Sequence, residues 1–445
     1  MSSTRAPAHA CLLRALRIVI AADSDPARQV LFGNLMSARL DVRLAFRCCN
    51  ALAGTRAAAL LISLYGLAYF LRIGVPQVPS ARVWAVAKHV NARRQVERIS
   101  AWVGAADCTA VPIGFAGAVT RLGIVLSPRS WHGIARALRV LHRVERRHGF
   151  LVACRVSAAI AWYARSTAML ARHRPGAVLV SSDSNPEEAG FTGAARALGI
   201  PQVFVAHAYP TPFSPRLDFS LSVLEGPAAV EARGRRGPIG GAVVFAGVEG
   251  ESAPLDVTRF LRPTPVIGIF TPKAVSWTTL STVVADCRRR FHPSRIVIRW
   301  HPSRLDAARQ LHSLGDMTGV EESSTSERLE DVARRCDWVI ADENSNVHLP
   351  VLKLGIPTVA VKSLGLYPAS RSDMYGFAAS GVIFPPVTSL DQISPEAFSA
   401  FFSSGWVDRF RRYDASYMHP QEDVRAHVRT SIRELFEPPH ALSHV

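Results

Sequence analysis

At 445 residues the chain is too long for one compact core, and the usual size of domains predicts two or three of them. Hydrophobic residues make up 48% of the chain and charged residues 20%, a balance that is typical of folded globular proteins and excludes an intrinsically disordered one. The net charge of +17 indicates an anionic partner such as a nucleotide, a polyanionic glycan or an acidic membrane surface. Nucleic acid is not the expected partner, because the sequence has no zinc-finger spacing, no basic zipper and no aromatic-rich RNA-binding signature.

The N-terminal segment carries a strand pattern followed by a long uncharged run. Arg17–Ala22 (RIVIAA) predicts a first strand that passes into a helix, and Asp23-Ser24-Asp25 after it is formally a D-x-D, a weak metal signal. Ala57–Leu71 is uncharged and lies between Arg56 and Arg72. At ~1.5 Å per residue this run is too short for a hydrocarbon core of ~30 Å. The two remaining interpretations are a buried helix and a helix that dips into a membrane surface, with its basic flanks on the headgroups.

The seven cysteines are scattered, odd in number and free of C-x-x-C spacing. This pattern favours reduced thiols in the cytosol over a disulfide framework or a zinc site. The expected location is therefore cytoplasmic, with peripheral contact to the inner face of the cytoplasmic membrane as a further expectation from the basic charge and the uncharged run.

The clearest strand–helix–strand pattern lies between residues 175 and 225. Ala177–Val180 predicts a buried strand, Glu187–Leu198 a helix closed by Gly199, and Gln202–Ala206 the next strand. Parallel pairing with a right-handed crossover follows. Residues 232–254 contain six glycines and predict a loop-rich boundary bearing a hairpin.

After this boundary, strands and helices alternate again. Strands are predicted at 266–270, 295–300, 338–341 and 358–361, with helices at 277–290, 305–314 and 326–335, another ending near Leu354, and more helices after about Pro395. The alternation predicts an α/β chain with two Rossmann-like, doubly wound parallel-sheet domains that face a central cleft. The expected domains are an N-terminal acceptor domain, 1–250, and a C-terminal nucleotide-donor domain, 251–445. The last helices either stay with the second domain or cross back to the first.

Ligands of open parallel sheets bind beyond the carboxyl ends of the strands, so the residues at the strand exits are the candidates. Five exits carry polar groups that can act on phosphate or protons, namely Asp183, His207, Thr271-Pro272-Lys273, His301-Pro302-Ser303-Arg304 and Asp342-Glu343-Asn344-Ser345-Asn346. This coincidence is the main reason to expect a catalytic cleft.

Two of these exits predict phosphate contacts. In Arg299–Arg304 a histidine that is fixed by the following proline lies between two arginines. These side chains could bind the phosphates of a nucleotide diphosphate, and the alternative is a solvated basic strand end. Asp342–Asn346 precedes a helix, so Glu343, Ser345 and Asn346 are candidates for an anion site or for simple N-capping. Lys273 is one of only four lysines and is a phosphate candidate or an exposed loop residue.

His207 and Asp183 are the candidates for proton transfer. With an unperturbed pKa of ~6.5, His207 could take a proton from an acceptor hydroxyl, or it could be a structural loop histidine. Asp183 could orient His207, act as the base itself, or cap the helix that follows.

At these motifs the chain resembles bacterial capsule, surface-polysaccharide and teichoic-acid transferases of the CDP-glycerol glycerophosphotransferase-like kind. Val178–Pro212 looks like the segment with "GIP…QHG" that ends their first sheet, Arg299–Ser303 (RWHPS) like their "R-x-HP" motif, and Asp337–Val361 like their "D-x-SS…G-x-P" block. The resemblance covers about 180 to 365 and implies a GT-B fold, a nucleotide-activated sugar or polyol phosphate as donor, a glycan or lipid-linked glycan as acceptor, and no cofactor or metal. It matches His207 to the family's base or acceptor-site histidine, His301 to the histidine on the donor phosphate, and Ser345 to the serine of the phosphate-binding block.

The chain departs from this family at three positions. Ala208 stands where the family usually has glycine, Asn346 replaces its second serine, and Pro350 lies near the position of the glutamate that many GT-B enzymes use on the donor ribose. Two alternatives to a transferase therefore stay open. One is a nucleotide-sugar epimerase with Asp183, Glu187 or Glu343 as the carboxylates, and the other is a non-catalytic subunit of a polysaccharide assembly complex.

Overall fold

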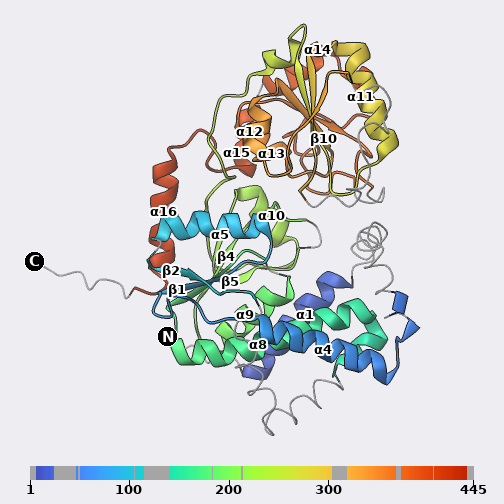
Figure 1. Ribbon diagram of the computed structural model, residues 1–445. Coiled ribbons are helices and arrows are strands. Elements are labelled where there is room, and N and C mark those ends of the chain that lie inside the picture. The colour runs from blue at the N-terminus through green and yellow to red at the C-terminus, as the bar shows by residue number, and fades with distance from the viewer. Residues whose placement is uncertain are drawn as a thin grey trace, which may run out of the picture.

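The computed structural model describes residues 7–24, 47–48, 51–104, 106–114, 140–182, 184–211, 214–302, 318–366, 372–403 and 405–437 (Figure 1). Within them the chain forms a six-stranded sheet followed by a five-stranded sheet, and all pairings between the named strands are parallel. The predicted α/β class with two parallel sheets is confirmed. The six described cysteines are free thiols.

The first sheet has the strand order β2-β1-β3-β4-β5-β6. Its strands are β1 Val83–Val86, β2 Cys108–Ala110, β3 Ala177–Val180, β4 Gln202–Val205, β5 Asp218–Leu224 and β6 Gly240–Phe245. The associated helices are α1 Ala8–Asp23, α4 Arg56–Arg72, α5 Val90–Val103, α8 Phe150–His173, α9 Pro186–Ala197 and α10 Pro227–Gly234. The predicted β3–α9–β4 unit is therefore confirmed, with its strands paired in parallel.

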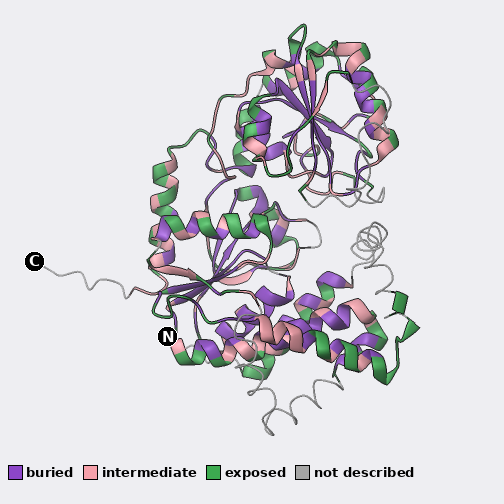
Figure 2. Cartoon of the chain, in the orientation of Figure 1, coloured by how far each residue is buried: buried purple, intermediate pink, exposed green. Residues whose placement is uncertain are grey.

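Side chains alternate along each strand, so both faces of the first sheet carry apolar side chains, and helices cover each face. Trp84 and Val178 point to the layer of α8 and α9, where they join one apolar core. Val83 and Leu179 point the other way, to a second core that contains residues of α5 and of α16 (Gln421–Arg433). Figure 2 shows the central strands of both sheets buried, with exposed residues on the outer sides of the helices.

The second sheet has the order β11-β10-β7-β8-β9. Its strands are β7 Val266–Phe270, β8 Arg295–Arg299, β9 Val320–Glu322, β10 Trp338–Asp342 and β11 Thr358–Val361. The helical elements are η1 Val257–Leu261, α11 Trp277–Phe291, α12 Leu329–Arg334, α13 His348–Lys353, η4 Leu390–Gln392, α14 Pro395–Ser403 and α15 Trp406–Tyr413. Strands and helices lie where the sequence pattern places them, although α12 begins three residues later than predicted; the helix predicted at 305–314 lies outside the described residues.

The C-terminal segment returns to the first domain. After α15 the backbone N–H of Ala415 donates to the carbonyl of Glu225 at the end of β5, and α16 packs on α5, β5 and β6 (Figure 1). The predicted boundary at 250/251 falls in the segment between β6 and η1. Two backbone connections therefore run between the domains, one outward through residues 246–256 and one back through the C-terminal segment.

A buried ion pair joins these two connections to the second domain. Lys353 of α13 and Asp414 are both fully buried, with Nζ and Oδ2 3.0 Å apart. Lys353 Nζ also donates to the carbonyl of Val248 and to Ser416 Oγ, each at 2.6 Å. Gly247, next to Val248, has φ +66°, and a Cβ there would lie 1.9 Å from Ser416 Oγ, so this junction accepts only glycine without rearrangement.

Two predictions about the first domain are wrong. Arg17–Ala22 is not a strand but the C-terminal part of α1, whose buried residues include Leu16 and Val19, so its apolar positions follow the helical period. Residues 232–254 form no hairpin, because β6 pairs in parallel with β5 after the crossover helix α10. Asp23 of the formal D-x-D pairs with Arg155, and Asp25 lies outside the described residues.

The uncharged run forms the helix α4, as predicted, but the helix is not fully buried. Ala58, Ile62 and Gly66 are buried and face α8, where Ser157 Oγ donates to the carbonyl of Ile62 at 2.9 Å. The opposite side presents an exposed apolar stripe of Ala57, Leu60, Leu61, Leu64 and Tyr65. Leu60 is 59% and Leu64 50% exposed, so the interpretation as a buried helix is wrong for this side. In the described part of the chain no helix has both the length and the apolar character needed to cross a membrane.

Candidate functional site

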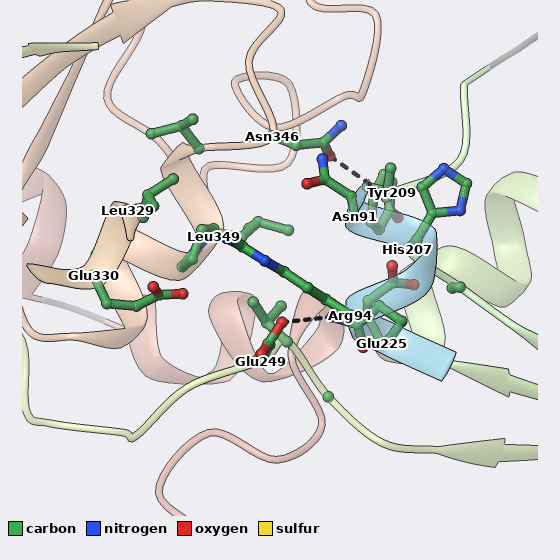
Figure 3. A pocket seen from close by; sticks show the side chains of 17 residues that line it. Asn91, Arg94, His207, Tyr209, Glu225, Glu249, Leu329, Glu330, Asn346 and Leu349 are labelled. Atoms are coloured by element: carbon green, nitrogen blue, oxygen red, sulfur yellow. Dashed lines mark hydrogen bonds between the residues drawn. The ribbon is translucent and has the colours of Figure 1, made fainter. Parts of the chain in front are cut away.

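A cavity of about 210 Å³ lies between the two domains, at the carboxyl ends of the first sheet's strands (Figure 3). The first domain contributes residues of α5 and residues that follow β4, β5 and β6, while the second contributes the starts of α12 and α13. The carboxyl ends of parallel strands lie at the same edge of a sheet, so the polar groups that follow these strands meet in this cavity, as expected for open parallel sheets.

His207, which follows β4, lines the cavity. Its Nδ1 lies against the carbonyl oxygen of Ser181, at the exit of β3. A carbonyl only accepts, so Nδ1 carries the proton and donates it, and in the neutral ring Nε2 is left with its lone pair. The orienting partner seen here is a backbone carbonyl; Asp183, which was predicted to play that role, lies outside the described residues.

Three cationic or protonatable groups at the ends of β7 and β8 lie together. Burial, followed by the charges of Lys273 and Arg299, lowers the pKa of His301 to about 4. Burial lowers the pKa of Lys273 and, as the main cause, that of Arg299 as well. His301 is therefore neutral at pH 7, and its backbone N–H donates to Thr271 Oγ1 at 3.2 Å. Arg304 and Ser303 lie outside the described residues.

This cationic group continues into the first domain through His89, which precedes α5. Burial lowers the pKa of His89, and the charges of Lys88, His207 and Lys273 lower it further. Groups from both domains therefore share one electrostatic environment, with His207 and His89 on one side and Lys273 on the other.

An acidic group faces the same cavity. Glu225 follows β5, Glu249 follows β6 and Glu330 lies in the first turn of α12 (Figure 3). Glu225 is 8% exposed, and burial raises its pKa to about 7. Glu249 Oε2 accepts a hydrogen bond from Gln95 Nε2 at 2.8 Å, and Arg94 also lines the cavity.

The predicted phosphate-binding block after β10 is largely engaged in protein contacts. Ser345 Oγ accepts from the backbone N–H of Val347 at 3.3 Å, in the turn before α13, and the N-cap position of this helix has no side-chain cap. Glu343 is buried and accepts from Ser372 Oγ at 2.9 Å. Asn346 Oδ1 accepts from the backbone N–H of Tyr209 at 3.2 Å and so joins the two domains across the cavity (Figure 3). Among the nominated residues, the structure brings His207 and Asn346 to the cavity wall and places Lys273, His301 and Arg299 in the adjoining cationic group.

The sequence did not point to Arg94, Gln95, His89, Glu225, Glu249 or Glu330. Glu225 had a signal: it directly follows the apolar end of DFSLSVL, which is β5, and a strand prediction there would have made it a strand-exit residue. In the parts of the chain that the structure describes, no three His, Cys, Asp or Glu side chains converge on a metal site. The predicted independence from metals and cofactors stays a prediction.

No family model and no curated protein matches the sequence. Solved structures with partial likeness include S. aureus MnaA in complex with UDP (TM-score 0.47, 10% identity, 80% of this chain and 98% of that one). The glycosyltransferase SnogD from Streptomyces nogalater (0.45, 15%, 79% and 99%) and MurG of Acinetobacter baumannii (0.42, 13%, 79% and 98%) are similar to the same degree. TM-scores below 0.5 establish neither fold nor activity, so the architecture stands on the sheet topology described above.

Proposed function

We propose that the chain is a glycosyltransferase that moves a sugar, or a polyol phosphate, from a nucleotide-activated donor to a bacterial surface-polysaccharide acceptor. The observation that carries the proposal is that His207, with its Nδ1 against a backbone carbonyl, lines the cavity from one domain, while the cationic group of Lys273, His301 and Arg299 belongs to the other. A base and an anion site on facing domains are what transfer from a phosphate-activated donor requires.

In the proposed step for a sugar, Nε2 of His207 takes the proton of the acceptor hydroxyl as that oxygen forms its bond to the sugar's anomeric carbon. The bond from this carbon to the donor phosphate breaks, and its electron pair stays with the departing nucleoside diphosphate. Lys273 and Arg299 stabilise the charge that develops there, and neutral His301 donates a hydrogen bond to it.

The first experiment is a thermal-shift screen of the full chain against CMP, CDP, UDP, GDP and dTDP, with and without Mg²⁺. A ligand present at 100 times its Kd stabilises the folded state by ~2.7 kcal/mol. A rise in melting temperature with a nucleotide, equal with and without Mg²⁺, is the expected result. No rise with any of them would contradict nucleotide-dependent transfer and favour the non-catalytic subunit.

A nucleotide-sugar epimerase is the second candidate, and the three carboxylates of the cavity favour it. They are Glu225, Glu249 and Glu330. Of the carboxylates that the sequence suggested, Glu187 and Glu343 are engaged in other contacts, and Asp183 lies outside the described residues. Glu187 forms an ion pair with Lys88, with Nζ and Oε1 2.6 Å apart. Product analysis separates the two reactions, because an epimerase converts the nucleotide sugar without any acceptor and a transferase releases nucleotide only when an acceptor is present.

Peripheral contact with an anionic membrane is the second part of the proposal, and α4 supports it. The exposed stripe of Leu60, Leu61, Leu64 and Tyr65 is a contiguous apolar surface of the kind that marks interaction sites. Basic residues flank it: Arg56 is exposed at the start of α4, and exposed Arg146 and Arg147 belong to the helical segment whose Glu145 accepts from the backbone N–H of Gly54. The combination suits acidic headgroups beside acyl chains.

Co-sedimentation at low salt tests this contact. The full chain is expected to pellet with phosphatidylglycerol vesicles and much less with phosphatidylcholine vesicles, and the double change Leu60→Ser/Leu64→Ser is expected to release it. Leu261→Ser is the control, since Leu261 is 49% exposed on the second domain. A wild-type chain that stays in the supernatant with anionic vesicles would rule out the membrane contact and leave the transferase proposal standing.

A further inference from the structure

We infer that the acidic side of the interdomain cavity holds the nucleoside half of the donor, and that this nucleoside has a base with an exocyclic amino group: cytosine, adenine or guanine. This acidic chamber is defined by Glu225, Glu249 and Glu330, together with Arg94 and Gln95. The inference rests on the proposed nucleotide-dependent function and narrows its donor. It does not depend on which reaction the donor then undergoes.

The first step is the polarity of the cleft. The cationic group of Lys273, His301 and Arg299 suits the phosphates, whereas a chamber with three carboxylates and one arginine repels them. The two regions are contiguous, because the side chain of Arg299 experiences the charges of both Glu330 and Arg94. A nucleotide whose phosphates lie on the cationic group therefore has its uncharged half next to the carboxylates.

The second step is the deepest carboxylate. Glu225 lines the cavity and is only 8% exposed. Its Oε2 has no hydrogen-bond partner among the described residues. A buried polar atom without a partner is costly, and a ligand that donates a hydrogen bond would satisfy it. The nearest cationic side chains that influence it are Arg233 and Arg98, which approach from the protein side and not from the cavity lining.

The third step is which base can donate. A carboxylate accepts hydrogen bonds, as it does from the N4 amino group of cytosine in nucleic-acid recognition. Uracil and thymine present a carbonyl oxygen at the equivalent position, which an ionised carboxylate repels, so the comparison belongs above the value of about 7 to which burial raises the pKa of Glu225. Ionised Glu225 therefore favours an amino-bearing base, while the less buried Glu249 and Glu330 suit ribose hydroxyls, which carboxylates bind in dinucleotide sites. These two would supply the carboxylate that Pro350, on the same cavity wall, cannot.

The experiment measures Kd by calorimetry for matched pairs that differ in one group: CDP against UDP, GDP against IDP, and CDP against dCDP. At least one amino-bearing nucleotide is expected to bind about 10-fold or more tightly than the partner that lacks the amino group, since a good base contact discriminates by ~1–3 kcal/mol and 1.4 kcal/mol is tenfold. The 2′-deoxy form is expected to bind more weakly. Because these probes carry no sugar, the preference belongs to the nucleoside and not to an amino sugar.

Glu225→Gln is the diagnostic variant, because glutamine keeps the shape but offers an amide that donates as well as accepts. It is expected to reduce the ratio of the Kd values for the partners without and with the amino group several-fold toward one. Glu251→Gln is the control, with a side chain 86% exposed and paired to Arg334 outside the cavity. UDP binding as tightly as CDP, together with IDP binding as tightly as GDP, would overturn the inference while leaving the proposed function intact. Failure of every nucleotide to bind would overturn both.

Discussion

The side chain of His207 shows how a backbone atom can prepare a base. The carbonyl of Ser181 accepts from Nδ1, so the neutral ring carries its proton on Nδ1, which is the tautomer that the proposed base requires. Replacing His207 by Ala is expected to lower kcat by ~10²–10⁴-fold with little change in KM or melting temperature. His419→Ala, at an exposed position of the C-terminal segment, is the control. Unchanged turnover in H207A would favour the non-catalytic subunit over a catalyst.

The pKa of His301 reports on the cationic group around it. Burial is the main cause of its low value of about 4, and the charge of Lys273 comes next. Lys273→Met removes that neighbouring positive charge, so protonation becomes easier and the pKa of His301 is expected to rise. An NMR titration of the His301 ring measures it, with Lys362→Met at an exposed position as the control. An equal pKa in wild type and K273M would place Lys273 away from the histidine.

Nucleotide binding is expected to move the same pKa in the same direction. A diphosphate brings negative charge to His301 and favours the imidazolium. Saturation with the nucleotide that stabilises the chain best should therefore raise the His301 pKa, whereas the same nucleotide should leave the exposed His419 unaffected. A pKa that stays at its ligand-free value in the saturated protein would remove His301 from the phosphate site.

Residue identities in the site could be predicted only where they follow a strand that the sequence reveals. His207 and His301 follow apolar strands and were found from the sequence. Glu225 was missed because β5 was not predicted, whereas Glu249 and Arg94 were missed because their roles depend on β6 and α5 and on the second domain across the cavity. Long-range packing of this kind has no local signature in one sequence.

At the scale of elements, the pair of Lys353 and Asp414 fixes α13 to the two interdomain connections. Lys353→Met leaves Asp414 as a buried carboxylate without its cation and is expected to reduce the free energy of unfolding by ~3–5 kcal/mol. Equilibrium denaturation measures this loss. Arg334→Met, which breaks the exposed pair with Glu251, should change it by less than ~1 kcal/mol.

The double variant Lys353→Met/Asp414→Asn tests the reason for that loss. Asparagine removes the charge but keeps an oxygen for the N–H groups of Val248 and Ser416, so part of the lost stability is expected to return. A double variant less stable than K353M alone would mean that shape, and not the uncompensated charge, dominates.

The elements that were predicted well share a simple pattern. β3, α9 and β4 combine a continuous apolar strand, a capped helix and a closing glycine, so the local sequence decides them. The residues of RIVIAA are of the types that favour a strand, yet they continue the buried helical face that begins at Cys11 and Ala15. The packing of α1 on α8 and α9 therefore decides that this segment is a helix. Short strands such as VWAV (β1) are equally ambiguous, since four apolar residues fit a strand or a buried helix.

At the scale of the whole molecule, the first domain is completed by the C-terminal helix α16. Val428 and Ile432 of this helix are fully buried in the core that also holds residues of β3, β4 and β5. Ile432→Ala is expected to destabilise the first domain by ~2–5 kcal/mol, seen as faster hydrogen exchange in β4 to β6. Thr430→Ala, on the exposed side of α16, should lie within ~0.5 kcal/mol of wild type. Faster exchange confined to the second sheet would contradict the docking of α16 on the first.

The return of α16 also has a consequence for how the protein is made. A ribosome delivers residues 83–245, the whole first sheet, long before it delivers residues 421–433, yet the α5 side of that sheet is covered completely only when the latter arrive. The first domain therefore cannot reach its final form in the order of synthesis, although N-terminal domains generally fold first. The nascent chain holds an apolar sheet face open while the entire second domain is translated, and this interval is when a chaperone would be needed most.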